Sequence, residues 1–200
     1  MLHLTRSCLS ALGLALALAA APASAATVEA RFGALDGLGI GLASGDSFEY
    51  GDLVNPQADG TDDWVFGGFS AQLPASWSGP LTGATLQVFA GGWGLDGNAG
   101  VYLNNQFIGE LTNGDSGSDP LSRAYLDSFD LGAFLGLIGI DNTVEIRAVN
   151  PDDGGSLGFF KLTLQTQDAG GNTVPEPDGA ALAAVAIVSA WLASRRRRQA

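Results

Sequence analysis

The chain has 200 residues, a formal net charge of −12 and only 15% charged residues, while glycine occupies 29 positions. This charge argues against a nucleic-acid partner, because binding to phosphates needs clustered lysine and arginine. The single histidine (His3) and the single cysteine (Cys8) both lie near the N-terminus. If that segment is removed, the remaining chain has no disulfide, histidine-based triad, thiol nucleophile or zinc site of the usual ligands.

Residues 1–25 have the pattern of a secretory signal peptide. Arg6 supplies a positive charge, and an apolar run of leucine and alanine follows over residues 9–21. Residues 23–25 read Ala-Ser-Ala, the small-x-small pattern that a signal peptidase accepts. We therefore expect export and a mature chain that starts near Ala26. An N-terminal anchor that is never cleaved is the alternative, and the shortness of the apolar run disfavours it.

Residues 26–169 are expected to fold as one all-β domain, because apolar and polar residues alternate with period two and helical periodicity is almost absent. Eight or so short strands separated by glycine, asparagine and aspartate predict a β-sandwich of the jelly-roll type. Another antiparallel barrel is the alternative. The main segments expected as strands are 28–34, 47–54, 62–69, 84–90, 101–103, 107–111, 124–130, 143–148 and 160–165, with a short helical turn over 134–140.

Asn104 and Asn105 separate two of these strands, and asparagine tolerates the positive φ that a tight hairpin requires. The hairpin, residues 101–109, is similar to one found in galactose-binding-like jelly rolls. Residues 141–146 look like the turn and strand that follow this hairpin in that superfamily. The resemblance implies a jelly-roll sandwich but no particular ligand, since folds of this kind host many functions.

Acidic residues dominate the predicted domain: residues 26–173 contain four basic and 19 acidic side chains, a net charge of −15. Such a charge keeps an exported domain soluble and attracts divalent cations. Two acidic loops offer the oxygen ligands that Ca²⁺ prefers, although neither has the EF-hand spacing. The resemblance to galactose-binding-like domains also implies a structural Ca²⁺, and solvated acidic loops are the alternative. The candidate calcium ligands are Asp59, Asp62, Asp63, Asp152 and Asp153.

Two tryptophans are candidates for sugar binding, because a pyranose ring stacks on an exposed aromatic ring while its hydroxyls bind polar groups. Trp77 lies between serines and Trp93 lies between glycines, both in loop-like settings. Trp64 is expected to fill the core of the sandwich. For each tryptophan, a role in the core or as an anchor of a loop is the alternative.

A glycan hydrolase would need two carboxylates that face one substrate. Asp62 and Asp63 would point to opposite faces of a strand. Asp152 and Asp153 lie in a predicted turn that reads as a solvated loop. We therefore assign no catalytic residue and expect no enzymatic activity, with a hydrolase as the least favoured alternative.

The C-terminal region has three parts: a linker over 170–178, an apolar stretch over 179–194 and a basic tail over 195–200. The apolar stretch would measure roughly 22 Å as a helix, which is shorter than the hydrocarbon core of a membrane. The terminal arginines lengthen the effective span by snorkelling and hold the tail in the cytoplasm. We expect a single transmembrane helix, with a buried core helix as the alternative. The motif in the linker is Val174, Pro175, Glu176 and Pro177. The membrane stop signal is Arg195, Arg196, Arg197 and Arg198.

The order of this proline-glutamate-proline motif, apolar helix and arginine cluster resembles the PEP-CTERM sorting signal of Gram-negative bacteria. The resemblance implies recognition by an exosortase, cleavage at or near the motif, and association with exopolysaccharide and biofilm. Together with the signal peptide, it predicts a protein anchored in the inner membrane, with its N-terminus in the periplasm, and then delivered to the cell surface or the extracellular space.

The sequence thus predicts an exported, non-enzymatic cell-surface or matrix protein, with signal peptidase and an exosortase as processing partners and an exopolysaccharide as a further candidate partner. A carbohydrate-binding module with a structural calcium ion is the alternative function. No other cofactor is expected.

Overall fold

The computed structural model describes residues 25–53, 56–115 and 121–167, which belong to one compact unit, Ala25–Gln167. The signal peptide, the sorting motif, the apolar stretch and the arginine tail lie outside the described residues. Within the described part of the chain, no helix is long and apolar enough to cross a membrane.

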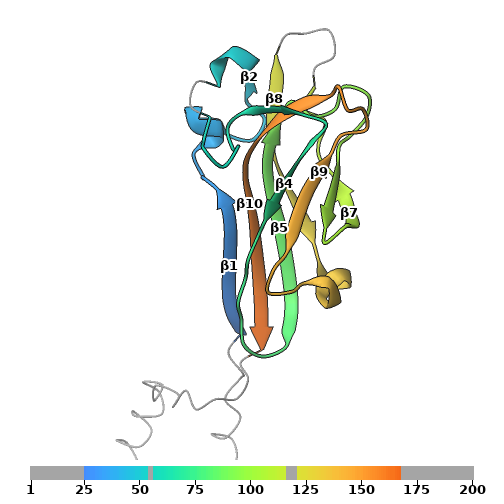
Figure 1. Ribbon diagram of the computed structural model, residues 1–200. Coiled ribbons are helices and arrows are strands. Elements are labelled where there is room, and N and C mark those ends of the chain that lie inside the picture. Colours follow the sequence, from blue (N-terminus) through green and yellow to red (C-terminus); the bar gives the residue numbers. More distant parts are fainter. Residues whose placement is uncertain (1–24, 54–55, 116–120, 168–200) are drawn as a thin grey trace, which may run out of the picture. The chain divides into compact units, whose positions relative to one another are not determined.

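The described residues form two antiparallel sheets that pack against each other as a β-sandwich (Figure 1), which confirms the predicted all-β class. The larger sheet has the order β1-β10-β5-β8-β2, with β3 also paired to β10. The smaller sheet has the order β4-β9-β6-β7. The strands are β1 Ala25–Gly33, β2 Ser47–Phe48, β3 Trp64–Phe66, β4 Gly68–Gln72, β5 Leu81–Gly91, β6 Gly100–Leu103, β7 Gln106–Glu110, β8 Ser122–Asp130, β9 Thr143–Arg147 and β10 Gly154–Gln167.

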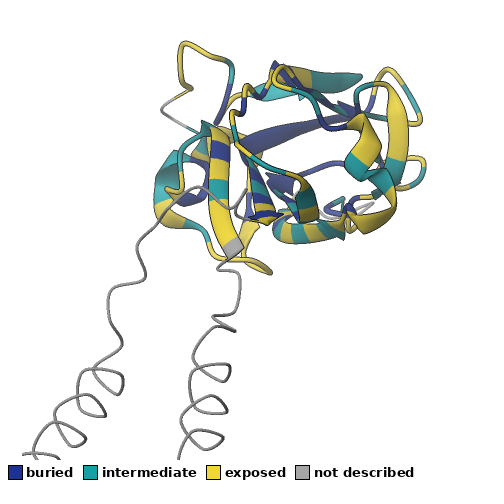
Figure 2. Ribbon diagram, turned by 90° about the horizontal axis from the view of Figure 1, so that it is seen from below, coloured by how far each residue is buried: buried dark blue, intermediate teal, exposed yellow. Residues whose placement is uncertain are grey.

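The main core lies between the two sheets and is built from the apolar residues of the alternating pattern. Leu86 and Val88 of β5, Leu162 of β10, and Val144 and Ile146 of β9 are all at most 1% exposed. Figure 2 shows the buried residues gathered in the interior, between strands whose outer positions are exposed. Burial of each such side chain contributes about 1.5–3 kcal/mol, so the alternation in the sequence determines which face of each strand turns inward.

A smaller apolar cluster covers the outer face of the larger sheet. Phe89 and Phe159 alternate with core-facing neighbours, so they point to the opposite face, where their rings stack at 5.8 Å. Leu38 of the short helical segment η1 (Gly37–Gly41) and Phe48 of β2 pack over them. This second cluster secures the segment that connects β1 to β3.

Strand β10 pairs with two strands in succession along one side. Residues 159–167 of β10 pair with β1, and residues 154–156 of β10 pair with β3. The chain leaves this side of β10 at Gly33, which has a φ of +83°. A Cβ atom at Gly33 would lie only 2.1 Å from the carbonyl oxygen of Gly158, so only glycine fits there. Residues 34–63 lie between β1 and β3, and β3 then pairs with β10.

The predicted hairpin is confirmed. Asn104 and Asn105 have φ values of 50° and 68°, and Leu103 pairs directly with Gln106. This is the two-residue turn that requires positive φ at both central positions. The helical turn predicted near residues 134–140 is present as the 3-10 helix η3 (Gly132–Leu137).

Two predicted strands differ from the structure. The strand expected over 47–54 stops after Phe48, because the chain turns into a 3-10 helix, η2 (Tyr50–Asp52). The strand expected over 62–69 is interrupted at Gly67 and Gly68, with φ values of 77° and 146°. After this break the chain changes sheets: β3 pairs with β10 of the larger sheet, and β4 belongs to the smaller sheet.

Candidate functional site

A pocket of about 280 Å³ opens at one end of the sandwich, where β5 ends and β8 and β10 begin. The strand register places Ser156 beside Gly91 at this end, whereas Ala25 and Gln167 pair at the opposite end. The pocket is therefore built from loops that are distant in sequence. Its lining residues are Tyr50, Trp64, Phe66, Gly92, Leu95, Asp115, Ser122, Asp152, Asp153 and Gly154.

Three aromatic rings form the apolar wall of the pocket. Trp64 and Phe66 are two residues apart on β3, so their side chains project from the same face of the strand. The ring of Tyr50 meets Trp64 edge to face, with 5.7 Å between centroids. Tyr50 is 66% exposed and Phe66 is 68% exposed, whereas Trp64 is half-buried. The half-buried indole thus contacts the Tyr50 ring, and the rings of Tyr50 and Phe66 both remain open to a ligand.

Two glycines allow the Trp64 indole to lie against the backbone. A Cβ atom at Gly92 would lie 2.5 Å from Cη2 of Trp64, and one at Gly154 would lie 2.3 Å from Nε1. A Cβ at Gly154 would also come within 3.0 Å of the Phe66 ring. Side chains at these positions would push the aromatic wall outward, so both glycines position it.

Three aspartates contribute negative charge to the pocket. Asp153 is 2% exposed, and its Oδ2 accepts a hydrogen bond of 3.0 Å from the backbone N–H of Gly94. Burial raises the pKa of Asp153, and the hydrogen bond from Gly94 opposes that rise. Asp152 is exposed and lies in a turn that is held by a 2.9 Å hydrogen bond from its N–H to Oδ1 of Asn150. Asp115 is half-buried and also lines the pocket.

The tryptophans predicted to bind sugar lie elsewhere. Trp93 is 1% exposed in the main core, so its ring is closed to a ligand, contrary to the prediction. Trp77 is half-buried against the same core and does not line the pocket. Trp64, expected in the core between the sheets, instead packs on the smaller apolar cluster and lines the pocket. Tyr50 and Phe66 were not predicted to line a site. For Phe66, the aromatic residues at alternate positions 64 and 66 of a short strand were a usable signal.

The five predicted calcium ligands fall into two places. Asp152 and Asp153 lie at the pocket, and the other three lie on the loop before β3. Oδ1 of Asp59 accepts hydrogen bonds from the N–H and the hydroxyl of Thr61 at 3.0 and 2.6 Å, and the hydroxyl bond lowers the pKa of Asp59. Oδ1 of Asp63 accepts a bond of 2.8 Å from the N–H of Trp64. Among the described residues, no three His, Cys, Asp or Glu side chains lie close enough to hold a metal together.

Asp62 is different, because it is 1% exposed and neither of its carboxylate oxygens has a hydrogen-bond partner among the described residues. Its backbone has a φ of 59°, and its N–H donates to the carbonyl of Leu157 at 2.9 Å. Burial raises the pKa of Asp62 to about 6, and the charges of Asp36 and Asp59 add to the rise. A buried carboxylate without a partner is unstable as an anion, so this site favours a bound proton or cation.

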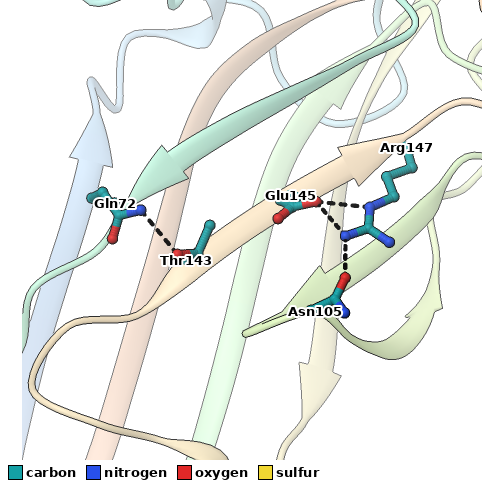
Figure 3. Close-up of polar contacts among 5 residues, drawn as sticks. All are labelled: Gln72, Asn105, Thr143, Glu145 and Arg147. Carbon is teal, nitrogen blue, oxygen red and sulfur yellow. Dashed lines mark hydrogen bonds and ion pairs between the residues drawn. The ribbon is translucent and has the colours of Figure 1, made fainter.

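The outward face of the smaller sheet carries a second group of polar side chains (Figure 3). Arg147 donates from Nε to Glu145 at 2.7 Å and from Nη2 to Asn105 at 2.6 Å. Gln72 donates to the hydroxyl of Thr143 at 2.9 Å. Because these groups pair with one another, we assign no ligand to this face.

Comparison with known proteins gives no family for the chain: no family model matches the sequence, and no curated protein does. Solved structures with a similar arrangement include the glycoside hydrolase BuGH86 in complex with neoagarooctaose, at 13% identity and a TM-score of 0.40 over 71% of this chain. Another is BpGH86A, a β-porphyranase of glycoside hydrolase family 86 from the human gut bacterium Bacteroides plebeius, at 17% identity and a TM-score of 0.35 over 53% of this chain. The chain spans only 18% and 20% of those proteins. Scores of this size support no conclusion about function.

Proposed function

We propose that the protein is an exported, non-enzymatic surface or matrix protein whose sandwich binds a carbohydrate at the pocket. The observation that carries this proposal is the pair of exposed rings, Tyr50 and Phe66, which line one pocket with the carboxylate of Asp152. Aromatic faces next to polar groups are the combination with which proteins hold a pyranose ring. A volume of about 280 Å³ suits one sugar unit or the end of a chain.

We assign the sandwich to the jelly-roll, galactose-binding-like type. The hairpin at Asn104 and Asn105 supports this assignment, as does strand β9 (Thr143–Arg147), which follows the Asp141 turn at the expected distance. In such sandwiches, loops at one end suit ligand binding because the paired sheets hold them in place. The pocket lies among loops of this kind.

The arrangement of the carboxylates favours binding over hydrolysis. A glycoside hydrolase needs one acid and one base or nucleophile, both facing the scissile bond. Asp153 is almost fully buried, and its Oδ2 is bonded to Gly94. We therefore treat Asp153 as a structural residue that fixes the loop, and we assign the contact with a ligand to the exposed Asp152.

The same proposal includes delivery by the C-terminal signal. Pro175, Glu176 and Pro177 would be read by an exosortase while the following apolar helix and arginines hold the substrate in the inner membrane. A glycan-binding domain suits a protein delivered to an exopolysaccharide matrix. Intact-mass spectrometry of the protein from its native host tests this directly. Loss of about 25 N-terminal residues together with all residues after the motif is expected, and a species that retains the arginine tail would refute sorting.

Carbohydrate binding is tested on a glycan array with the protein and its Tyr50→Ala and Phe66→Ala variants. Each variant is expected to lose about 5- to 150-fold in affinity, because stacking of a ring-shaped ligand such as a base on an aromatic side chain supplies about 1–3 kcal/mol. Phe107→Ala is the matched control, since Phe107 is 45% exposed on β7 and outside the pocket. An array without signal, or equal losses in all three variants, would reject the proposal.

We also propose that Ca²⁺ neutralises Asp62. The two buried carboxylate oxygens have no hydrogen-bond partner among the described residues and could supply two of the six to eight oxygen ligands that Ca²⁺ takes, and Asp36 and Asp59 add negative charge around them. Since no three acidic side chains converge among the described residues, backbone oxygens and water would complete the coordination. The ion would stabilise the loop that precedes Trp64. The stability of Asp62 variants with and without Ca²⁺ provides the test.

A further inference from the structure

We infer that the carbohydrate recognised at the pocket carries a positive charge, as in a hexosamine whose amine is free and protonated. This inference rests on the proposed carbohydrate binding and specifies the chemistry of the ligand at the same pocket. It follows from three features of the lining: the sign of its charges, the identity of its apolar wall, and the way the loops hold its acids in place.

The charged groups of the lining all have one sign. Asp115, Asp152 and Asp153 line the pocket, and no lysine or arginine does so among the described residues. A carboxylate only accepts hydrogen bonds, whereas an ammonium group only donates them. The pocket is therefore matched to a ligand rich in donors. A uronate or a sulfated sugar would instead bring a negative charge close to three carboxylates, which strongly disfavours acidic polysaccharides.

The aromatic wall favours the same ligand. The face of an aromatic ring is electronegative, so a cation placed over Tyr50, Trp64 or Phe66 is attracted to it. A sugar amine beside these rings would interact with the ring faces on one side and with carboxylates on the other. A neutral sugar can stack on the rings and donate hydroxyl hydrogen bonds to the carboxylates, but it has no charge for the rings and the acids to attract. The rings and the acids thus reinforce each other for a cationic sugar.

The loops that carry Asp152 and Asp153 are held in position before a ligand arrives. The turn of Asp152 is fixed by Asn150, whose side chain also donates to Asp96 in the neighbouring loop. Asp153 holds the backbone of Gly94, which ties the same two loops together. Loops fixed in this way lose little conformational entropy when a ligand binds. The favourable electrostatic free energy is therefore not offset by a cost of ordering the loops.

The test compares the affinities of the full-length protein, purified in detergent, for four-unit oligomers of glucosamine, N-acetylglucosamine and glucose. Calorimetry at low salt and at a pH where the amine is protonated is expected to give about tenfold tighter binding of the glucosamine oligomer, as two partly exposed ion pairs would provide. Raising the salt to about 1 M should remove most of this preference, because charges are then screened within about 3 Å.

Variants separate a local effect from the overall charge of the domain. Asp152→Asn is expected to reduce the preference for glucosamine over N-acetylglucosamine three- to fivefold, about the size of one exposed ion pair. Asp141→Asn makes the same change of charge at an exposed turn outside the pocket and should leave the preference unchanged. Equal effects of the two variants would overturn the inference, because the attraction would then come from net charge.

The outcomes also distinguish this inference from the function on which it rests. Equal binding of all three oligomers, lost in Tyr50→Ala, would reject the positive charge and retain carbohydrate binding. Binding of none of them, together with an empty glycan array, would reject both. Binding of the glucosamine oligomer that is unaffected by Tyr50→Ala would place the interaction outside the pocket and would also overturn the inference.

Discussion

Substitution of Asp62 by asparagine should stabilise the protein at neutral pH in the absence of divalent cations. Burial, with added repulsion from Asp36 and Asp59, raises the pKa of Asp62 from 3.8 to about 6. Each pKa unit corresponds to about 1.4 kcal/mol, so ionisation of Asp62 above pH 6 reduces the free energy of unfolding by roughly 3 kcal/mol. Asparagine is nearly the same size and carries no charge, so it escapes this cost.

The pH dependence has a definite sign. Since the pKa is higher in the folded state, the stability linked to this group is fully present below about pH 4 and is lost as the pH rises through about 6. We therefore expect little difference between the protein and Asp62→Asn near pH 4 and a large one at pH 7.5. Urea unfolding in EDTA at several pH values measures this difference. In thermal melts, the gain corresponds to roughly 6–12 °C for a domain of this size.

If Ca²⁺ binds at Asp62, its addition should make the unsubstituted protein more stable than Asp62→Asn. The unsubstituted protein should then gain stability in proportion to the logarithm of the Ca²⁺ concentration, whereas Asp62→Asn should gain none. Asp63→Asn is the matched control, because Asp63 is the exposed neighbour and asparagine keeps an acceptor for the N–H of Trp64. If Asp62→Asn is destabilised equally at pH 4 and pH 7.5 in EDTA, the reasoning about the buried anion is wrong.

Three further substitutions test contacts that shape the fold, and the first of them lies at the pocket. Gly154→Ala should displace Trp64, lower ligand affinity about tenfold through the loss of roughly one stacking contact, and change tryptophan fluorescence. Gly33→Ala should cost about 2–4 kcal/mol in urea unfolding, because it adds a clash with Gly158 to a positive φ. Asn142→Ala should cost about 2–3 kcal/mol in the same assay, since this buried amide makes hydrogen bonds to three neighbouring segments. Unchanged fluorescence or stability in any of these variants would contradict the corresponding contact.

The sequence was sufficient to predict the strands of the core, because their alternation has a direct physical cause. Every second residue of a strand faces the same side, so Ala84, Leu86, Val88 and Ala90 had to be buried together if that segment was extended. The hairpin was equally accessible, since asparagine at positive φ is a local property. The break at Gly67 was not, because a glycine within a strand pattern does not reveal which sheet each half will join.

The pocket was harder to predict because its residues come together only through strand register. Nothing near Tyr50 in the sequence indicates Asp152. The two line one pocket because Tyr50 packs on Trp64 of β3, and β3 pairs with the first residues of β10. The tryptophans were misassigned for a related reason. A glycine-rich setting suggested that Trp93 was exposed, but the lack of a side chain at Gly155 is what lets its indole pack into the core, since a Cβ there would lie 2.6 Å from the ring.

The buried acid and the aromatic wall belong to one short segment, and this links the two proposals. The N–H of Asp62 is bonded to Leu157, and two residues later Trp64 pairs with Ser156, so both are seated on the same stretch of β10. Strand β3 has only three residues, and its position therefore depends on the contacts at its start. A proton or cation at Asp62 removes the destabilising charge from that start and favours the conformation in which Trp64 and Phe66 form the wall. A ligand on the wall favours the same conformation, so by linkage each should strengthen the binding of the other.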